Sequence, residues 1–298
     1  MKVFVTGATG FIGSALVHEL LHAGHQVLGL ARSDASAGAL LAAGAQVHRG
    51  DLQDLDSIRT GTAASDGVIH AGFIHDFSRF KEVCEVDRLA IETIGATLAG
   101  SNRPFIVTSG TALVRQGSLA TEDMASNHDR TQFPRVSETA ALAFTTKGVR
   151  SSAVRLSPSV HGEGDHHGFI PILIGIALQK GVVAYIGDGH HRWNAVHRLD
   201  AVHLYRLALE KGEAGVRYHA VGDEAITLKA ISEAIGRQLK LPVVSLSPEE
   251  AAAHFGWFAQ MAALDCPASS KITQERLDWH PSHPGLLEDL AGDIYFKP

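Results

Sequence analysis

The first part of the chain alternates between short apolar runs and a segment with helical periodicity. Lys2–Val5 is an apolar run of strand length that leads directly into glycines. Residues 14–24, SALVHELLHAG, place apolar side chains at helical spacing, and Gly24 is typical of the position just beyond a helix. Val27–Leu30 gives a second apolar run. The pattern predicts a strand, a glycine turn, a helix and a second strand within about thirty residues.

The last part of the chain has a different pattern. Residues 226–239 have the periodicity of an amphipathic helix, and residues 242–247 that of a short strand. Residues 248–265 resemble another helix, with Pro248 near its start, and contain an aromatic cluster that the first half lacks. Packing in a second core explains these aromatic side chains. A lid over an apolar substrate is the functional alternative.

Composition limits the classes of protein that fit. The chain has 298 residues, 45% of them hydrophobic, enough for one large α/β domain or two lobes. With 26 Lys and Arg against 32 Asp and Glu, and no long basic run, we expect neither nucleic acid nor a membrane as a partner. We see no membrane-spanning apolar run, no signal-peptide pattern and no CxxC spacing of the two cysteines. These features favour a cytoplasmic protein.

The glycines after the first strand have a spacing with a physical meaning. Gly7, Gly10 and Gly13 flank Phe11 and Ile12 in the sequence TGATGFIG. Glycines permit a tight turn and close approach of the backbone to a pyrophosphate, and the following helix presents free N–H groups at its positive end. A glycine turn that only packs a strand on a helix is the structural alternative. The flanking strand, helix and second strand favour a dinucleotide site.

This segment resembles the short-chain dehydrogenase/reductase superfamily, in particular its extended branch of nucleotide-sugar epimerases, dehydratases and ketone reductases. The GxxGxxG spacing carries the resemblance, and further matches follow along nearly the whole chain. They are Gly50–Leu52, Val68–Gly72, Pro104–Gly110, Val154–Gly162 and Val196–Ala201. The resemblance implies that a group of residues lies against the cofactor, with the first two at the adenine: Asp51, Leu52, His70, Ala71, Gly72, Ser157 and Ser159.

The resemblance also implies the architecture. We expect an α/β fold of the Rossmann type, a doubly wound parallel sheet with a small C-terminal substrate lobe. Residues 1–165 and 199–225 would form the NADP(H)-binding domain, and residues 166–198 and 226–298 the substrate-binding lobe. A homodimer through two long helices, roughly Arg79–Gly100 and Pro134–Lys147, is a further expectation from the resemblance.

The end of the second strand bears on the choice of nicotinamide cofactor. NAD sites place an Asp or Glu there for the ribose 2′-hydroxyl, whereas NADP sites have an Arg that meets the 2′-phosphate. Here Ala31 is followed by Arg32 and Ser33, and Asp34 comes late. Arg32 can hold a phosphate through two N–H groups, and Ser33 can donate to it. We predict NADP(H) in preference to NAD(H); the alternative is that Arg32 is a solvated loop residue.

Carbonyl reduction needs a hydride and a proton, and the proton donor of the resembled family is missing. That family uses a Tyr with a Lys four residues later, at the start of the helix after the fifth strand. Here that helix begins in QFPRVSETAALAF, residues 132–144, which contains neither residue. One alignment puts Pro134 and Glu138 at the two positions, and a shift by one puts Arg135 and Thr139 there. None of the four tyrosines of the chain has a Lys at that spacing.

Several residues could replace the missing pair. Ser109 and Thr111 follow the fifth strand, where a hydroxyl can orient a carbonyl or only stabilise the turn. Histidine titrates near neutrality, and four of the 18 histidines lie on segments that the fold would bring towards the nicotinamide. They are His70, His75, His161 and His197. Beside the two hydroxyls, His161 is the candidate catalytic residue, although an ordinary packing role also fits each histidine.

Candidate substrate contacts lie on the same side of the fold. Arg135 stays protonated near neutral pH, so it cannot act as an acid, but it can stabilise a carbonyl oxygen or a substrate carboxylate. Trp193 could stack on an apolar substrate or pack the lobe. Phe73 and His197 complete this set. Tandem histidines near residues 166 and 190 lack the spacing of a zinc site, so we predict no metal.

These residues together predict an NADP(H)-dependent oxidoreductase that acts on a small carbonyl compound or alcohol with a non-standard proton donor. Two alternatives stay open. The protein could bind NADP(H) as a redox sensor without turnover, which the absent Tyr and Lys favour and the intact cleft-side segments oppose. It could also be an epimerase or dehydratase of a nucleotide sugar, although such enzymes usually need the Tyr–Lys pair and basic residues for a diphosphate.

Overall fold

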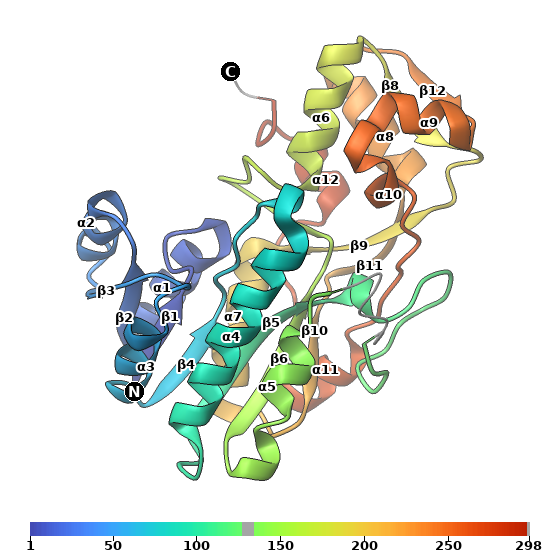
Figure 1. Ribbon diagram of the computed structural model, residues 1–298. Coiled ribbons are helices and arrows are strands. Elements are labelled where there is room, and N and C mark those ends of the chain that lie inside the picture. Colours follow the sequence, from blue (N-terminus) through green and yellow to red (C-terminus); the bar gives the residue numbers. More distant parts are fainter. Residues whose placement is uncertain (127–133, 297–298) are drawn as a thin grey trace.

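The computed structural model describes residues 1–126 and 134–296 and has a seven-stranded parallel sheet at its centre (Figure 1). The strand order is β10-β6-β5-β4-β1-β2-β3. The strands are β1 (Lys2–Thr6), β2 (Gln26–Ala31), β3 (Gln46–Arg49), β4 (Gly67–His70), β5 (Pro104–Gly110), β6 (Arg150–Leu156) and β10 (Arg217–Ala220). The central strands are buried on both faces, which explains why they are continuous apolar runs. The predicted doubly wound α/β fold is confirmed.

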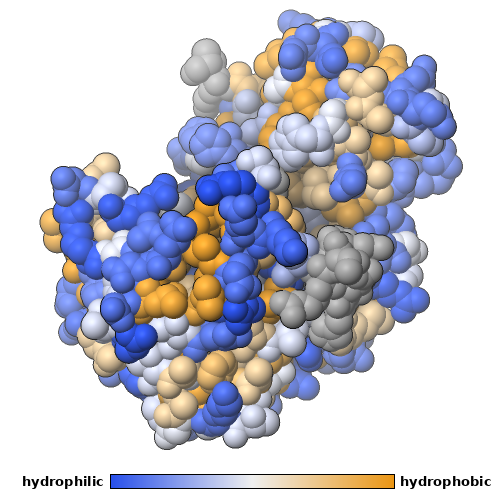
Figure 2. Space-filling model, in the orientation of Figure 1, coloured by the Kyte–Doolittle hydropathy of each residue, from blue (hydrophilic) through white to orange (hydrophobic). Residues whose placement is uncertain are grey.

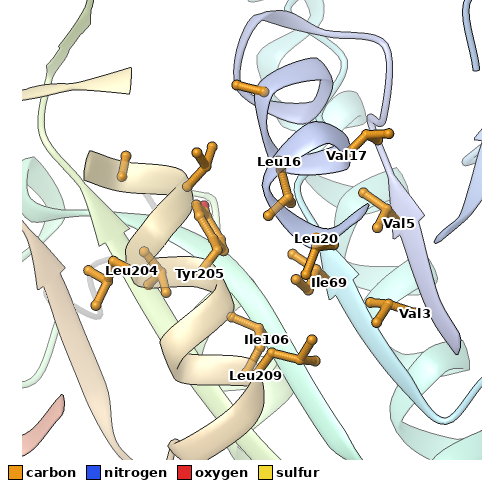
Figure 3. Close-up of a cluster of buried hydrophobic side chains, with 14 of the residues drawn as sticks. Val3, Val5, Leu16, Val17, Leu20, Ile69, Ile106, Leu204, Tyr205 and Leu209 are labelled. Atoms are coloured by element: carbon orange, nitrogen blue, oxygen red, sulfur yellow. The ribbon is translucent and has the colours of Figure 1, made fainter. Parts of the chain in front are cut away.

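Helices cover both faces of this sheet. Val3 and Val5 of β1 pack with α1 and α7 on one face (Figure 3), and Phe4 packs with α3, α4 and α5 on the other. The helices are α1 (Phe11–His22), α2 (Asp34–Ala42), α3 (Leu55–Ala63), α4 (Phe80–Leu98), α5 (Ser137–Leu142) and α7 (Arg198–Lys211). Because successive side chains of a strand point to opposite faces, β1 joins the two helical layers.

A smaller lobe follows the carboxyl end of β6. It holds a three-stranded sheet, β11-β9-β7, and a two-stranded sheet, β12-β8. The strands are β7 (Ser159–His161), β8 (Val183–Ile186), β9 (Arg192–His197), β11 (Asp223–Thr227) and β12 (Val243–Leu246). The helices are α6 (Phe169–Lys180), α8 (Leu228–Leu239), α9 (Pro248–Phe255), α10 (Ala259–Ala262) and α12 (Leu286–Ala291). The space-filling view shows this lobe and the main body as two masses with a notch between them (Figure 2).

Short elements complete the chain. Helix α11 (Lys271–Leu277) packs against α7 and β10 of the main body. The 3₁₀ turns are η1 (Phe77–Arg79), η2 (Thr111–Leu113), η3 (Thr145–Lys147) and η4 (Gly256–Phe258). Within the described residues, no helix combines the length and the apolar character needed to cross a membrane.

Two predicted helices are wrong in length. The helix expected over residues 134–147 is the short α5 followed by the turn η3. The hydroxyls of Thr145 and Thr146 donate to carbonyl oxygens three residues earlier, a local bonding that competes with a regular helix. The helix expected over residues 248–265 is divided into α9 and α10 by Gly256, whose φ of +55° lies in the left-handed region. The helix expected near residues 79–100 is confirmed as α4.

Candidate cofactor and substrate site

The glycines of the turn between β1 and α1 are required by close backbone packing. Gly7 has a φ of +67°, and a Cβ atom on it would lie 2.6 Å from the Cα atom of Gly72 at the end of β4. A Cβ atom on Gly13 would lie 1.9 Å from the carbonyl oxygen of Gly7. No side chain of a described residue caps α1 at Gly10, so its first N–H groups can meet a phosphate. This bare backbone fits a dinucleotide pyrophosphate.

Phe11 and Ile12 form the first turn of α1 and are partly exposed beside the glycine turn. The guanidinium of Arg198, at the start of α7, lies 5.0 Å from the centre of the Phe11 ring. The adjacent N-termini of α1 and α7 therefore meet at this edge of the sheet.

The end of β2 carries an exposed cation. Arg32 has no ion-pair partner among the described residues. The carboxylate of Asp34 already accepts from Arg49 at 2.6 Å. Ser33 caps α2, its Oγ accepting from the N–H of Ser36. This end of β2 thus offers a guanidinium while its own carboxylate is neutralised, the arrangement that suits a 2′-phosphate.

Asp51 and Leu52 lie beside the end of β2. The N–H of Gly50 donates to the carbonyl oxygen of Ala31 at 3.2 Å, which holds the turn after β3 against β2. Ser57 fixes the same turn, because its Oγ accepts from the N–H of Asp51 at 3.3 Å. Both Asp51 and Leu52 are partly exposed, so they can border an adenine placed at this strand end.

His70 is a buried support of the glycine turn. Only 1% of the residue is exposed. Its Nδ1 lies 2.9 Å from Thr6 Oγ1 and its Nε2 lies 3.2 Å from Asp87 Oδ1. The N–H of Gly72 donates to the same Thr6 hydroxyl at 3.1 Å. The imidazole ring therefore faces the interior and packs beneath the turn, while Ala71 and Gly72 carry the strand end past it.

Ser157 and Ser159 follow β6 and have exposed fractions of 5% and 2%. The hydroxyl of Ser157 donates to the carbonyl oxygen of Ala220 at 2.8 Å and so ties β6 to β10. The Oγ of Ser159 is buried without a partner among the described residues. Ser157 therefore ties two strands together, and the contact of either serine with the cofactor stays a prediction.

The two hydroxyls at the end of β5 differ in their environment. Thr111 is fully buried, and its hydroxyl lies within donating distance of Asn194 Oδ1, at 3.0 Å, and of the Leu156 carbonyl oxygen, at 3.2 Å. It therefore ties β5 to β6 and β9, which contradicts a catalytic role. The hydroxyl of Ser109 makes no hydrogen bond with a described residue, although the residue is only 3% exposed. Ser109 is the hydroxyl that is left for a substrate.

Arg135 and Phe73 come together at the ends of β4 and β5. The guanidinium carbon of Arg135 lies 4.3 Å from the centre of the Phe73 ring. Its Nε donates to Ser137 Oγ at 2.9 Å, and its Nη2 donates to the carbonyl oxygen of Thr108 at 3.3 Å. Both predicted substrate contacts thus lie where β4 and β5 end.

His75 is the histidine that borders this group. Its ring packs edge-on against Phe73 with 5.5 Å between the ring centres. Burial, together with the charge of Arg135, lowers the pKa of His75. Of the four histidines that the sequence singled out, this one is therefore the best placed to exchange a proton with a group bound at Arg135.

His161, the predicted catalytic histidine, lies in another cluster. It is fully buried, and its Nδ1 lies 2.6 Å from the carboxylate of Asp289. Its ring packs edge-on against His197, which in turn stacks on His283 with 4.8 Å between the ring centres. The carboxylate of α12 thus fixes His161 inside the lobe, which contradicts its choice as the proton donor.

His197 is half-buried and caps α7, since its Nδ1 accepts from the N–H of Leu199 at 3.2 Å. Burial, with the charge of His161, lowers the pKa of His197. Together with Asp200 and His283 it forms a group of potential metal ligands. The two imidazole planes are within 8° of parallel, so their nitrogen lone pairs do not converge on one point. Asp200 also accepts backbone N–H groups of Ser282 and His283. The group therefore fits a structural role.

Trp193 belongs to the core of the smaller lobe. It is fully buried and packs against Phe169 and Phe258, with 5.6 and 6.2 Å between the ring centres. Its indole Nε1 is buried without a partner among the described residues. The structure thus contradicts substrate stacking and supports the packing alternative.

Comparison with known proteins agrees with this arrangement. The model of the "NAD dependent epimerase/dehydratase family" matches residues 3–98. A Schizosaccharomyces pombe protein, "Uncharacterized protein C2A9.02", is 50% identical over 298 residues, 99% of this chain and 100% of that protein. The chain belongs to the NAD-dependent epimerase/dehydratase family. This is the extended branch of the short-chain dehydrogenase/reductases, as the glycine spacing predicted.

The chain is also similar, at lower identity, to named enzymes. The "Sterol-4-alpha-carboxylate 3-dehydrogenase, decarboxylating" of Dictyostelium discoideum is 25% identical over 244 residues, 76% of this chain and 72% of that enzyme. The dTDP-glucose 4,6-dehydratase DesIV of Streptomyces venezuelae, solved with NAD and TYD bound, has a TM-score of 0.77 at 18% identity. It covers 99% of this chain and 96% of its own, and the likeness concerns the fold.

One alignment puts Glu138 at the position of the missing Lys, and there this member of the epimerase/dehydratase family has an internal ion pair. The carboxylate of Glu138 accepts from Arg155 Nε and Nη2, both at 2.7 Å, and from Arg217 Nε at 2.6 Å. Glu138 therefore faces β6 and β10. Tyr205 does not replace the missing Tyr, because it is fully buried with its hydroxyl 2.7 Å from Thr108 Oγ1. Burial also raises its pKa.

The sequence reasoning missed Asp87, which is 2% exposed on α4. It lies at helical spacing among the buried side chains of Val83, Ile91 and Ile94. A carboxylate within the apolar stripe of an amphipathic helix is the signal that could have revealed it, because buried charges need partners.

Proposed function

We propose that this protein is an NADP(H)-dependent oxidoreductase that interconverts a small carbonyl compound and its alcohol. The observation that carries the proposal is the hydroxyl of Ser109, which makes no hydrogen bond with a described residue and follows Thr108, whose carbonyl oxygen accepts from Arg135. A hydroxyl and a cation side by side suit a carbonyl oxygen that gains negative charge. The dehydrogenase among the relatives supports this type of chemistry for the family.

The preference for NADP(H) rests on the end of β2. Arg32 is exposed and lacks an ion pair among the described residues, whereas Asp34 is paired with Arg49. A guanidinium binds a phosphate through two parallel N–H groups. The 2′-phosphate of NADP(H) would therefore meet a cation, whereas the strand end lacks the carboxylate that usually accepts from the 2′-hydroxyl of NAD(H).

The side chains at the site divide the work of carbonyl reduction. A nicotinamide bound at the strand ends would supply the hydride. Ser109 would donate a hydrogen bond to the carbonyl oxygen and orient it, and Arg135 would stabilise the negative charge that develops there. His75 would pass a proton to this oxygen, directly or through water. Phe73 would exclude water from the face of the substrate.

A redox sensor without turnover is the second candidate. One observation favours it: the helix that would carry the Tyr–Lys pair is fixed by Glu138, Arg155 and Arg217. Such a protein would bind NADP(H) and leave it unchanged.

Cofactor titration and a substrate panel test the proposal together. Purified protein should bind NADPH more tightly than NADH, and Arg32→Ala should remove about tenfold of that preference while leaving NADH binding unchanged. With aldehydes and ketones the protein should oxidise NADPH. Ser109→Ala should lower kcat about 10- to 100-fold without changing NADPH affinity. Tight NADPH binding with no oxidation across the panel would support the sensor, and thermal stabilisation by UDP-glucose would support a nucleotide-sugar enzyme.

A further inference from the structure

A chain of five buried or half-buried side chains links the cofactor turn to Arg135. We call it the Asp87 network: Thr6, His70, Asp87, Ser137 and Arg135. The carboxylate of Asp87 lies 3.2 Å from His70 Nε2 and accepts from the hydroxyl of Ser137 at 2.5 Å. Ser137 accepts from Arg135 Nε at 2.9 Å. With His70 protonated on Nε2, the Thr6 hydroxyl donates to His70 Nδ1, and every contact has one donor and one acceptor.

Asp87 remains charged in this network although it is 2% exposed. Burial disfavours its charged form, but the hydrogen bond from His70, the charge of Arg135 and the hydrogen bond from Ser137 together hold its pKa below the usual range. The carboxylate is therefore a fixed anion beneath the site. It gives the guanidinium of Arg135 a preferred position through the hydroxyl that the two share.

These contacts do not use all the N–H groups of Arg135. Its Nε and Nη2 are bonded, but its Nη1 has no partner among the described residues, and none of their carboxylates pairs with it directly. The guanidinium rests on the face of Phe73, and Phe73 packs edge-on against Phe80 at 6.3 Å. A half-buried cation with a free N–H edge and aromatic neighbours is well suited to bind a desolvated anion.

We infer that the substrate is an oxo acid whose carboxylate binds Arg135, and that Ser137 and Asp87 are positioning residues for that cation. The inference rests on the proposed reductase function. Arg135 bonds to the carbonyl of Thr108, the residue before Ser109, so a carboxylate on Arg135 leaves a nearby ketone within reach of the Ser109 hydroxyl. This favours 2-oxo and 3-oxo acids, in which one or two bonds separate the carboxyl and ketone carbons.

The reaction of such a substrate balances. The ketone carbon gains a hydride as NADPH is oxidised to NADP⁺, the carbon–oxygen π bond breaks, and the oxygen gains a proton to give a hydroxy acid. The carboxylate keeps its bonds and its charge, so its interaction with Arg135 contributes to binding in both directions.

A matched pair of substrates tests the inference: 3-oxobutanoate and its methyl ester, which keeps the ketone and lacks the charge. Wild-type protein should have a kcat/KM at least about tenfold higher for the acid. Arg135→Gln should lower kcat/KM for the acid about 100-fold and that for the ester at most about tenfold, because the ester loses only the stabilisation of its carbonyl oxygen. Arg135→Lys should recover part of the loss, because it keeps the charge without the planar geometry.

The variant Ser137→Ala tests whether Ser137 positions Arg135 or only stabilises the fold. It removes the hydroxyl between Arg135 and Asp87, so KM for the acid should rise about three- to tenfold, with a smaller change in kcat and in kcat/KM for the ester. Ser137→Thr keeps a hydroxyl and should restore the KM. NADPH affinity serves as the control and should be the same in all variants.

The outcomes distinguish this inference from the proposed function. If neither substrate is turned over with NADPH, and other carbonyl compounds are not either, the reductase function itself is wrong. Equal kcat/KM for acid and ester in the wild type, or equal losses for both in Arg135→Gln, would overturn the carboxylate assignment and leave the reductase function standing.

Discussion

Two networks of charged and polar side chains pass through consecutive residues of the short helix α5. They differ in how many of their hydrogen-bonding groups have a partner. The Asp87 network reaches α5 at Ser137 and ends at Arg135, whose Nη1 has no partner among the described residues. The Arg155 network starts at Glu138 and contains Arg155, Arg217 and His219. Arg155 is fully buried, and each of its nitrogens has a partner: Glu138, His219 or the carbonyl oxygen of Met124.

The difference shows how one helix can serve structure and chemistry at once. Successive residues of a helix point in directions about 100° apart, so Ser137 faces the strand ends while Glu138 faces β6 and β10. The Arg155 network, which we call the closed network, fixes the helix. The Asp87 network, which we call the open network, presents the cation of Arg135. The position at which the family's Lys was sought therefore carries an anchor, and the cation of the site comes from Arg135, before the helix begins.

The largest effect should come from breaking the closed network. Among the described residues, Arg155→Met would leave the buried carboxylate of Glu138 with Arg217 alone and remove the hydrogen bond at His219 Nε2. Loss of one member of a buried ion pair costs about 3–5 kcal/mol, because the remaining charge stays desolvated. The free energy of unfolding from urea titration should fall by that amount.

A surface ion pair is the matched control for this change. Arg59 pairs with Asp56 on α3, where both side chains are mostly exposed. Arg59→Met should change the free energy of unfolding by less than about 1 kcal/mol. Similar losses in Arg155→Met and Arg59→Met would show that the closed network does not anchor α5.

The fold was predictable because its signals are local. The apolar run Lys2–Val5, the glycines at 7, 10 and 13 and the helical apolar pattern after them lie within one unit, and β1, α1 and β2 form there. The lengths of α5 and α9 were not predictable from the same pattern. They depend on Thr145, Thr146 and Gly256, whose local preferences compete with an otherwise helical sequence.

The site was predictable only in part, because its partners are distant in the chain. Arg135 and Phe73 were found from their segments, but the Asp87–Ser137 bond joins residues 50 positions apart. Trp193 and His161 were misassigned because pockets and cores use the same residue types. Their burial depends on α6, η4 and α12, which the sequence could not place against them.

A pH titration probes the closed network with an intermediate effect. Burial, with the charge of Arg155, lowers the pKa of His219 to about 4. In the unfolded chain His219 would then be protonated below about pH 6.5, whereas in the folded protein it stays neutral down to about pH 4. The free energy of unfolding therefore falls as pH drops from about 6.5 to 4. The loss due to His219 should be on the order of 3 kcal/mol.

The variant His219→Gln isolates this contribution. Urea midpoints measured for both proteins between neutral pH and pH 4.5 should show a shallower pH dependence in the variant, because Gln does not titrate. Glu138, whose pKa is held low mainly by Arg155 against the cost of burial, adds its own loss only at more acidic pH. Identical slopes in the two proteins would mean that the pKa of His219 is the same in the folded protein and in the unfolded chain.

The smallest change in stability should come from Arg135→Gln, which tests the Asp87 network as Arg155→Met tests the Arg155 network. Among the described residues, the half-buried Arg135 bonds only to a hydroxyl and a carbonyl oxygen, and Asp87 keeps its bonds from His70 and Ser137 when Arg135 is removed. The free energy of unfolding should therefore change by about 1 kcal/mol or less. Urea titration beside Arg155→Met measures the contrast directly. A loss as large as that of Arg155→Met would mean that Arg135, too, belongs to a structural anchor, and the cation at the strand ends would then be explained by folding rather than by substrate binding.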